Sequence, residues 1–440
     1  MSKQQTIVNE RKAALDILLC VKERHEPLPF CRDRIFDARD IKEKKSRAFI
    51  TQLVYGTIEN IIRIDHIIDA FSKIKTQKMK PKIAALLELA VYQIIYMDSV
   101  PVSAACDESV KLTKKTGFAG LSGFVNGVLR SIADGFDKVS FPDEQDDLVK
   151  YLSLEYSIPG WCVSLWLRDY GKEKTKEIAE GTRRKSPLFI RTNTADLSAD
   201  ELKDRLEAEG VTAQHIPVGP DFVFSISGLD SVASLESFKE GCFYVQDLSC
   251  ILSGEMYGLK KGDNVLDVCA APGGKSINTA LMLQGLGGGK VTSCDVSEDK
   301  TSLIKENIQR MNIKNIIVEK RDATVFNENF KEAFDVVIAD VPCSGLGIIS
   351  RKPDILLRLK ETDISGLSRL QKKITDNAVK YVKEGGRFVF STCTLNKEEN
   401  EKNVEYIKEK TGFEEVCFKT VFPGDNDGGD GFFTAVFRKK

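Results

Sequence analysis

The fold is decided by a stretch in the second half of the chain that reads as a strand, a glycine turn and the start of a helix. The stretch is Asn264-Val265-Leu266-Asp267-Val268-Cys269-Ala270-Ala271-Pro272-Gly273-Gly274-Lys275. Its apolar first half predicts a buried strand over 264–269, and the two glycines let the backbone turn tightly and approach a ligand closely. The helix that we expect over 276–283 would offer free N–H groups to a carboxylate or a phosphate. Taken alone, the stretch fits an ordinary strand-to-helix turn equally well.

Strand and helix patterns alternate around this stretch, from about Gly241 to the end of the chain. We predict further strands at 290–295, 315–319, 334–340 and 386–392, and helices at 298–311, 365–383 and 398–410. Such alternation is typical of a doubly wound parallel sheet. Residues 431–437 predict one more strand at an edge of the sheet, for which an antiparallel direction is open. The carboxyl ends of neighbouring parallel strands share one crevice, and ligands bind there.

Aspartates close three of the predicted strands: Asp295, Asp322 and Asp340. An acidic side chain at the position of Asp295 can accept both hydroxyls of a ribose, and Asp322 would lie near an adenine. S-adenosylmethionine fits these residues better than NAD, because Pro272 stands where a dinucleotide fingerprint has a glycine. The alternative is that each aspartate only caps a helix, and Asp295 in particular could begin the helix that follows it.

Two cysteines follow predicted strands, in Asp340-Val341-Pro342-Cys343-Ser344-Gly345 and in Ser391-Thr392-Cys393-Thr394. A thiolate that adds to carbon 6 of cytosine makes carbon 5 nucleophilic toward a sulfonium methyl group, which is covalent catalysis. Loss of the carbon-5 proton and of the thiolate completes the reaction, and Asp340 is the candidate to hold the amino and ring-nitrogen edge of the base. A single cysteine is more often a small core residue, but this pair beside a cofactor turn favours function. The spacing leaves open which thiol attacks.

The remaining cysteines lack such a context. The 11 cysteines form no CxxC pair and no Cys/His cluster, so we expect no metal site and mostly reduced core thiols. We expect a structural role for Cys20, Cys106, Cys162, Cys242, Cys250, Cys294 and Cys417. Cys269 would act through its backbone. The polar start of the chain and the short apolar stretch 83–97, which carries Glu88, predict a cytoplasmic protein without a membrane span.

A length of 440 residues predicts two or three domains. Apolar spacing predicts helices throughout 7–133, and the helix over 123–130 has small residues that suit close packing. An acidic stretch over 134–147 marks a boundary, after which helices (159–170, 199–209) and strands (188–192, 222–227) predict a small α+β module. The resulting division is 1–140 helical, 141–240 connecting and 241–440 α/β.

Charge is distributed unevenly between these parts. Residues 1–140 hold 23 Lys and Arg against 17 Asp and Glu, a net of +6, whereas the rest of the chain holds 41 against 48, a net of −7. The basic part contains three clusters: Lys42, Lys44, Lys45 and Arg47; Lys73, Lys75, Lys78, Lys80 and Lys82; Lys111, Lys114 and Lys115. One such cluster is most simply a solvated helix face, but three in one domain favour a polyanion partner.

The motifs around Lys275, Cys343 and Cys393 resemble the signature of the RNA 5-methylcytosine methyltransferases. Supporting matches lie at 244–249, 351–355, 399–401 and 431–433. The stretches 48–56, 90–93 and 123–130 are similar to the NusB-like RNA-binding helical domain, and that fusion is typical of the small-subunit rRNA methyltransferase B branch. Thr394 stands where a serine is common and Val341 where a small residue is usual; both are mild departures.

The resemblance implies an α/β, Rossmann-like class I methyltransferase domain that methylates carbon 5 of a cytosine in 16S rRNA. It implies that Cys393 is the nucleophile and that Cys343 helps to release the product. The implied S-adenosylmethionine contacts are Cys269, Ala270, Ala271, Pro272, Gly273, Gly274, Lys275, Asp295, Asp322 and Asp340. We expect a monomer that acts on 16S rRNA or on a partly assembled small subunit.

Two alternatives remain beside the hypothesis of a 16S rRNA cytosine methyltransferase. One is the same chemistry on tRNA or on another rRNA site, and the other is a non-catalytic RNA-binding or assembly factor. The intact thiols and carboxylates argue against the second, because a site without activity has no need of them. Methylation of DNA is disfavoured, because the helical domain resembles an RNA binder.

Overall fold

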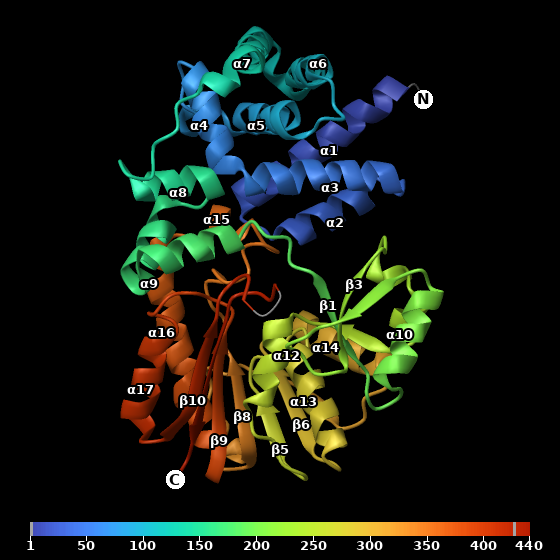
Figure 1. Ribbon diagram of the computed structural model, residues 1–440, viewed down its shortest axis with the longest axis vertical. Helices are drawn as coiled ribbons and strands as arrows, with labels where there is room; N and C mark the ends of the chain where they lie inside the picture. The colour runs from blue at the N-terminus through green and yellow to red at the C-terminus, as the bar shows by residue number, and fades with distance from the viewer. Residues whose placement is uncertain (1–2, 426–427) are drawn as a thin grey trace. The chain divides into compact units, whose positions relative to one another are not determined.

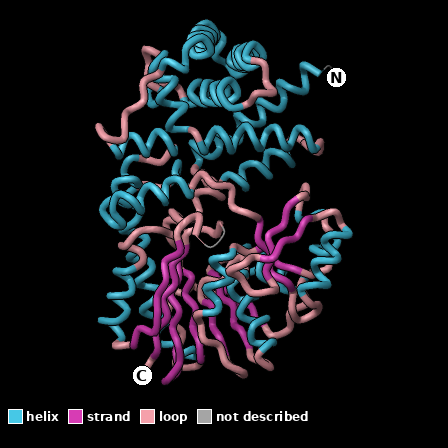
Figure 2. Tube along the Cα trace, in the orientation of Figure 1, coloured by secondary structure: helices cyan, strands magenta, loops and turns pink. Residues whose placement is uncertain are grey.

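The computed structural model describes residues 3–425 and 428–440 (Figures 1 and 2). The chain forms two compact units, each of which is made from two pieces of sequence. Unit 1 contains the residues up to Arg183 together with Arg351–Glu361, and unit 2 contains Arg184–Ser350 and Thr362–Lys440.

Unit 1 is helical, as predicted, and its core is built on one apolar helix. The helix α5 (Pro81–Tyr96) is buried along residues 83–93, and its proline stands in the first turn, where the missing N–H is not needed. Leu15, Leu53 and Leu129 from three other helices are fully buried in the same core. The other helices before residue 140 are α1 (Lys3–Arg24), α2 (Leu28–Ala38), α3 (Lys44–Glu59), α4 (Ile61–Phe71), η1 (Thr76–Lys78), α6 (Val102–Thr113), η2 (Lys114–Phe118), η3 (Ala119–Leu121), α7 (Ser122–Gly135) and η4 (Phe136–Lys138).

Two helices that we expected to belong to the connecting module belong to unit 1. They are α8 (Leu148–Tyr156) and α9 (Gly160–Gly181), which is longer than the helix predicted at 159–170. Polar contacts tie them to the core helices, because Arg63 pairs with Glu155 at 2.7 Å and Arg183 donates to Asn60 Oδ1 at 2.6 Å. The composition shift near residue 140 therefore marks a loop inside unit 1 and not the end of this unit.

A short segment from the second half of the chain completes unit 1. It contains α15 (Ile355–Arg358), and the carboxylate of Asp354 accepts a hydrogen bond from the backbone N–H of Leu28 at 3.3 Å. Leu357 packs against the helical core. Contacts between residues this far apart in sequence leave no periodic signal that would predict them.

Unit 2 begins with a small antiparallel sheet in the order β2-β3-β1-β4, which agrees with the α+β fold predicted for this region. Ser198 and Glu201 form a capping box at the start of α10, which fixes where this helix begins. The elements are β1 (Leu188–Thr192), α10 (Ala199–Ala208), β2 (Thr212–His215), β3 (Val223–Ser227), η5 (Val232–Ser234), α11 (Glu236–Lys239), β4 (Phe243–Val245) and α12 (Leu248–Glu255).

The larger sheet of unit 2 has seven strands in the order β10-β11-β9-β8-β5-β6-β7. The five strands from β9 to β7 in this order are parallel, as predicted, and β11 runs antiparallel to both of its neighbours. The strands are β5 (Asn264–Asp267), β6 (Lys290–Asp295), β7 (Ile316–Lys320), β8 (Phe334–Asp340), β9 (Val382–Thr392), β10 (Glu414–Val421) and β11 (Phe432–Arg438).

The prediction of an edge strand over 431–437 was wrong about its place. The strand β11 lies inside the sheet, six of its seven residues are buried, and β10 forms the edge. Glu414, Glu415 and Lys419 interrupt the apolar pattern of β10, as is common for exposed edges, and this is why the pattern did not predict a strand.

Helices cover both faces of this sheet (Figure 1). Val336 and Ile338 of β8 pack with α13 (Gly274–Gly285), and Val337 and Ala339 pack with α16 (Glu361–Ala378) and α17 (Glu401–Thr411). The helix α14 (Glu298–Arg310) follows β6. The short helix η6 (Glu328–Phe330) precedes β8, and η7 (Val379–Tyr381) precedes β9. In the described ranges no helix is long and apolar enough to cross a membrane.

Candidate active site

The glycine turn after β5 forms the first wall of the site. Ala270 N donates to Cys294 O of β6 at 2.9 Å, which joins the turn to the sheet. Gly273 N donates to Ala270 O at 2.7 Å, which closes the turn. Gly273 has a φ of 109°, a left-handed conformation that favours glycine, and it caps α13. The peptide between Ala271 and Pro272 is cis. The first turn of α13 presents N–H groups that the helix itself does not use.

Asp295 lies at the end of β6 and contacts this turn directly. Its side chain is about 6% exposed; Oδ2 accepts from Ala271 N at 3.0 Å and Oδ1 accepts from Val296 N at 2.8 Å. The side chain of Ser297 caps α14, so the alternative that Asp295 caps this helix is wrong. Oδ1 also pairs with the half-exposed Lys300 ammonium at 3.2 Å. Oδ2 therefore keeps a lone pair for a ligand, and Oδ1 offers one only where Lys300 turns away.

Asp322 lies in the loop that follows β7, at the carboxyl end of this strand. It accepts from Thr324 N at 2.8 Å and from Thr324 Oγ1 at 2.7 Å, and these bonds hold the pKa of its carboxyl below the usual range. It lines a cavity of about 280 Å³. The cavity walls are mixed. Apolar and aromatic side chains come from Val268, Ala323, Val325, Phe326, Phe330 and Tyr381, and polar or charged ones from Lys320, Arg321, Asp322, Asn327 and Glu328.

The two predicted catalytic thiols lie next to each other. Because β8 and β9 are parallel neighbours with Asp340 opposite Ser391, the loops that follow them emerge side by side. The sulfur atoms of Cys343 and Cys393 are 3.3 Å apart. The hydrogen bond to Cys393, together with burial, raises the pKa of the Cys343 thiol well above its usual range. Either sulfur can donate to the other, so one thiol can hold a proton while the other is a thiolate.

Asp340 is held by two side chains at the base of these loops. Its Oδ2 accepts from Lys275 Nζ at 2.6 Å and its Oδ1 accepts from Ser391 Oγ at 2.9 Å. Burial lowers the pKa of the Lys275 ammonium, but the Asp340 carboxylate outweighs it, so the net shift of this pKa is upward. We expected Lys275 in the cofactor turn, and its side chain instead joins that turn to the thiol loops. The Asp340 side chain remains 30% exposed and can reach a ligand.

A fully buried carboxylate, Glu399, holds the two thiol loops together, and sequence reasoning gave it no role. It accepts from Ser344 N at 3.0 Å, from the Ser344 hydroxyl, from Gln371 Nε2 at 2.8 Å and from Asn396 Nδ2 at 2.7 Å. Ser344 directly follows Cys343, so Glu399 fixes the backbone beside this thiol. The only signal in the sequence was the stretch 399–401, which supported the family resemblance.

Further contacts fix the loop that carries Cys393. Thr392 Oγ1 donates to Asn400 Oδ1 at 2.6 Å, and Asn400 Nδ2 donates to Thr394 O at 2.9 Å. Gly347 N donates to Cys393 O at 3.0 Å. A Cβ atom at Gly347 would lie 2.2 Å from Gly431 O. Only glycine therefore allows the loop after β8 to approach the segment before β11 this closely.

Asp267, the last residue of β5, is a second buried carboxylate that sequence reasoning did not single out. Its Oδ2 accepts from Ser276 Oγ at 2.8 Å and its Oδ1 accepts weakly from Cys269 N at 3.4 Å, so it joins the strand to α13 beneath the turn. Burial raises the pKa of Asp267 to about 7. Burial also raises the pKa of Cys269. That Cys269 acts through its backbone stays a prediction.

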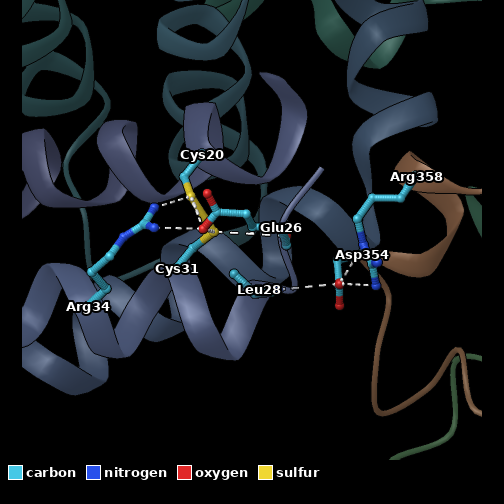
Figure 3. Close-up of a disulfide and its surroundings, with 7 residues drawn as sticks. All are labelled: Cys20, Glu26, Leu28, Cys31, Arg34, Asp354 and Arg358. Atoms are coloured by element: carbon cyan, nitrogen blue, oxygen red, sulfur yellow. Dashed lines mark hydrogen bonds and ion pairs between the residues drawn. A yellow bond between two sulfur atoms is a disulfide. The ribbon is translucent and has the colours of Figure 1, made fainter. Parts of the chain in front are cut away.

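One pair of cysteines in unit 1 departs from the expectation of reduced core thiols. Cys20 and Cys31 form a disulfide between α1 and α2, and Arg34 and Glu26 lie against it (Figure 3). Ligand atoms of Cys20, Glu26 and Cys31 lie within 4.8 Å of one another. A zinc ion needs thiolates, which a disulfide does not offer, and Arg34 adds a competing positive charge. The absence of a metal site stays a prediction.

Comparisons with known proteins cover nearly the whole chain. The family described as 16S rRNA methyltransferase RsmB/F matches residues 256–438, the NusB family matches residues 8–134, and a ferredoxin-like domain of RsmF/B-like methyltransferases matches residues 158–224. A probable ribosomal RNA small subunit methyltransferase B of Bacillus subtilis is 34% identical and covers 98% of each chain. The ribosomal RNA small subunit methyltransferase B of Escherichia coli is 28% identical over 90% of this chain and 91% of its own.

Solved structures support the fold. The crystal structure of PH0851 has a TM-score of 0.81 and 23% identity over 98% of both chains. The structure of NSun6 from Pyrococcus horikoshii with SFG has a TM-score of 0.56 and 22% identity, over 63% of this chain and 97% of its own. At these identities the similarity extends to the fold alone.

Proposed function

Because this chain belongs to the 16S rRNA methyltransferase RsmB/F family, it methylates a cytosine of 16S rRNA with S-adenosylmethionine, and we propose that Cys393 is its nucleophile. The observation that carries the proposal is the 3.3 Å approach of Cys393 and Cys343 beside Asp340, at the ends of two adjacent strands. One thiol can attack while the other holds a proton within reach.

The proposed steps assign one task to each of these side chains. The Cys393 thiolate forms a bond to carbon 6 of the base, and Asp340 accepts from the amino edge and thereby orients the ring. Carbon 5 becomes nucleophilic and takes the methyl group. The carbon-5 proton then passes to solvent water, the electrons of that C–H bond restore the double bond between carbons 5 and 6, and Cys393 leaves carbon 6 as a thiolate. Cys343, whose sulfur lies 3.3 Å from that of Cys393, assists this release. Lys275 and Ser391 keep Asp340 in place.

The residues of the glycine turn fit S-adenosylmethionine, which supplies the electrophilic methyl group. Asp295 Oδ2 has a lone pair left for one ribose hydroxyl, and Oδ1 can accept the other where the exposed Lys300 turns away. The first turn of α13 offers N–H groups to a carboxylate. The cavity beside Asp322 suits an adenine, because its aromatic side chains can contact the ring and its polar ones can bind the ring nitrogens. The cofactor contacts in this proposal are residues 269–275 with Asp295, Asp322 and Asp340.

The division of labour along the chain is also part of the proposal. Residues 1–140 supply RNA affinity, 141–240 connect the two functions, with α8 and α9 packed in unit 1, and 241–440 bind cofactor and base. We propose that the enzyme acts as a cytoplasmic monomer, on 16S rRNA alone or in a partly assembled subunit. The net charge of +6 over residues 1–140 supports the first assignment.

Trapping of the covalent RNA adduct tests the roles of the thiols. C343A should accumulate an RNA complex that resists denaturant, because addition proceeds and release is impaired. C393A should form no adduct and no product while it binds S-adenosylmethionine normally. C417A, which removes a free thiol from β10, is the matched control and should behave like the wild type. An adduct in C393A but not in C343A would reverse the assignment.

A further inference from the structure

Two lysine clusters that lie far apart in the sequence meet around one aromatic ring in unit 1. Lys80 and Lys82 stand at the start of α5, and Phe118 ends η2. The ammonium groups of Lys80 and Lys82 lie 5.4 Å and 5.7 Å from the centroid of the Phe118 ring. Lys114 and Lys115 are exposed in the same short helix as Phe118. We call Lys80, Lys82, Lys114, Lys115 and Phe118 the Phe118 patch.

Positive charge in this patch is not balanced by neighbouring residues. The two segments that build it, 73–82 and 111–118, contain eight lysines and no aspartate or glutamate. Lys111 pairs with Glu108 at 2.7 Å, whereas among the described residues no ion pair involves the four lysines of the patch. Like charges that gather without carboxylates repel one another, and a polyanion would relieve this repulsion.

The surface beside the patch is open to close approach. We expected the small residues of α7 to serve close packing, but a Cβ atom at Gly123 or Gly127 would meet no other atom within 4 Å. The same holds at Gly117, inside the patch. Gly123, Gly127 and Arg130 are exposed and follow one another at helical spacing, so they share one face. Internal packing does not require these glycines, and they leave the backbone accessible to a partner.

We propose that the Phe118 patch docks a single-stranded segment of 16S rRNA, with the lysines on phosphates and the Phe118 ring against a base; this rests on the proposed function. A ring beside several lysines is the combination that recognises unpaired RNA, because bases stack on aromatic side chains and phosphates pair with ammonium groups. An acidic protein surface would satisfy the lysines but would leave the ring without a flat partner.

The first test measures binding of the full-length chain to 16S rRNA at several salt concentrations. The variant K80Q/K82Q/K114Q/K115Q should bind at least about tenfold more weakly at 0.1 M salt, and its slope of log K against log salt should be shallower by about 3. Its affinity for S-adenosylmethionine and its thermal unfolding should match the wild type. At saturating RNA its kcat should be unchanged and its KM raised, which separates docking from the thiol chemistry.

The matched control removes four lysines outside the basic clusters, each paired with its own carboxylate: Lys174, Lys176, Lys239 and Lys408. K174Q/K176Q/K239Q/K408Q changes the net charge equally and should retain most of the affinity and of the salt slope. F118L should weaken RNA binding severalfold without changing the slope, because leucine fills the core side of the ring but cannot stack.

Two outcomes would overturn the proposal. Equal losses in both quadruple variants would mean that net charge matters and the Phe118 patch does not. Unchanged binding to naked rRNA with lost binding to the small-subunit particle would assign the patch to a ribosomal protein. Either outcome leaves the adduct experiment with Cys393 and Cys343 intact, so it would not count against the catalytic proposal.

Discussion

Asp295 and Glu399 are buried carboxylates that each accept several hydrogen bonds, but they serve different loops of the site. Asp295 braces the glycine turn through Ala271, and Glu399 braces the thiol loops through Ser344. The first also has capacity for a ligand, whereas the second is enclosed by four donors from the protein. Substitution should therefore affect cofactor binding in one case and turnover in the other.

For Asp295, we expect D295A to weaken binding of S-adenosylmethionine by about 2 kcal/mol, because two charge-assisted bonds to ribose hydroxyls are lost. Titration calorimetry measures this change. S297A, which removes only the cap of α14, should lower stability by about 1 kcal/mol and leave cofactor affinity unchanged. If D295A binds the cofactor as the wild type does, Asp295 serves only to brace Ala271.

For Glu399, E399Q places an NH₂ group where a carboxylate oxygen accepted hydrogen bonds. One or more donors would stay unpaired, at a cost of about 1–3 kcal/mol, and the loop at Ser344 would shift. We expect a large loss of kcat with unchanged S-adenosylmethionine affinity, measured by single-turnover kinetics and calorimetry. E398Q is the matched control, because the neighbouring Glu398 accepts from Lys402 and Ser368 and not from Ser344 or Asn396. Equal effects of the two variants would argue against a positioning role.

Strand order decides the site at the scale of elements. The glycine turn follows β5 and the thiol loops follow β8 and β9, and these three strands are consecutive neighbours in the sheet. Asp267 strengthens the first of these connections, because it joins the end of β5 to Ser276 of α13. The carboxyl of Asp267 is buried, and its ionisation is therefore linked to the stability of this strand–helix joint.

We expect the joint to weaken as the pH rises. The pKa of Asp267 is about 7 in the folded chain and about 4 in an unfolded chain, so the folded state binds more protons between these values. Stability contributed by the protonated form is complete below pH 4 and is lost as the pH rises to 7. D267N keeps the shape of the side chain but does not titrate. The urea midpoint of D267N minus that of the wild type should therefore increase between pH 4 and 7. A difference that does not change with pH would contradict the raised pKa.

At the scale of the whole molecule, the chain passes between the two units three times. The thiol loop after β8 continues into Arg351–Glu361, which belongs to unit 1, and the chain then returns to unit 2. Asp354 and Leu357 of this segment contact unit 1 helices. A single cut in the sequence therefore cannot separate the units cleanly, whatever the composition near residue 140 indicates.

Truncation tests this organisation. A chain of residues 141–440 keeps α8 and α9 but loses the helices that they pack against, so it should be poorly soluble. A chain of residues 184–440 keeps both sheets and the glycine turn, and it should bind S-adenosylmethionine as the full chain does. It should bind 16S rRNA more weakly and with a shallower salt slope. If 184–440 folds and binds rRNA like the full chain, the RNA-docking role of unit 1 is wrong.

The sequence by itself determined those features that depend on neighbouring residues. Strand periodicity predicted β6 and β8 to the residue, and the motifs around Lys275, Cys343 and Cys393 pointed to the right family. Such patterns are local, because a strand or a turn is encoded within a few consecutive residues. The same locality explains the failure at β10, where charges on an exposed edge hide the strand.

Only the tertiary structure decided which distant residues meet. It placed Cys343 against Cys393, turned the side chain of Lys275 toward Asp340, and brought Glu399 under both loops. It also joined Arg351–Glu361 to unit 1. These contacts depend on strand order and on the closing of long loops. The free energy that brings these elements together comes from the burial of apolar surface, which is non-directional. The sequence therefore does not show which distant residues will contact one another.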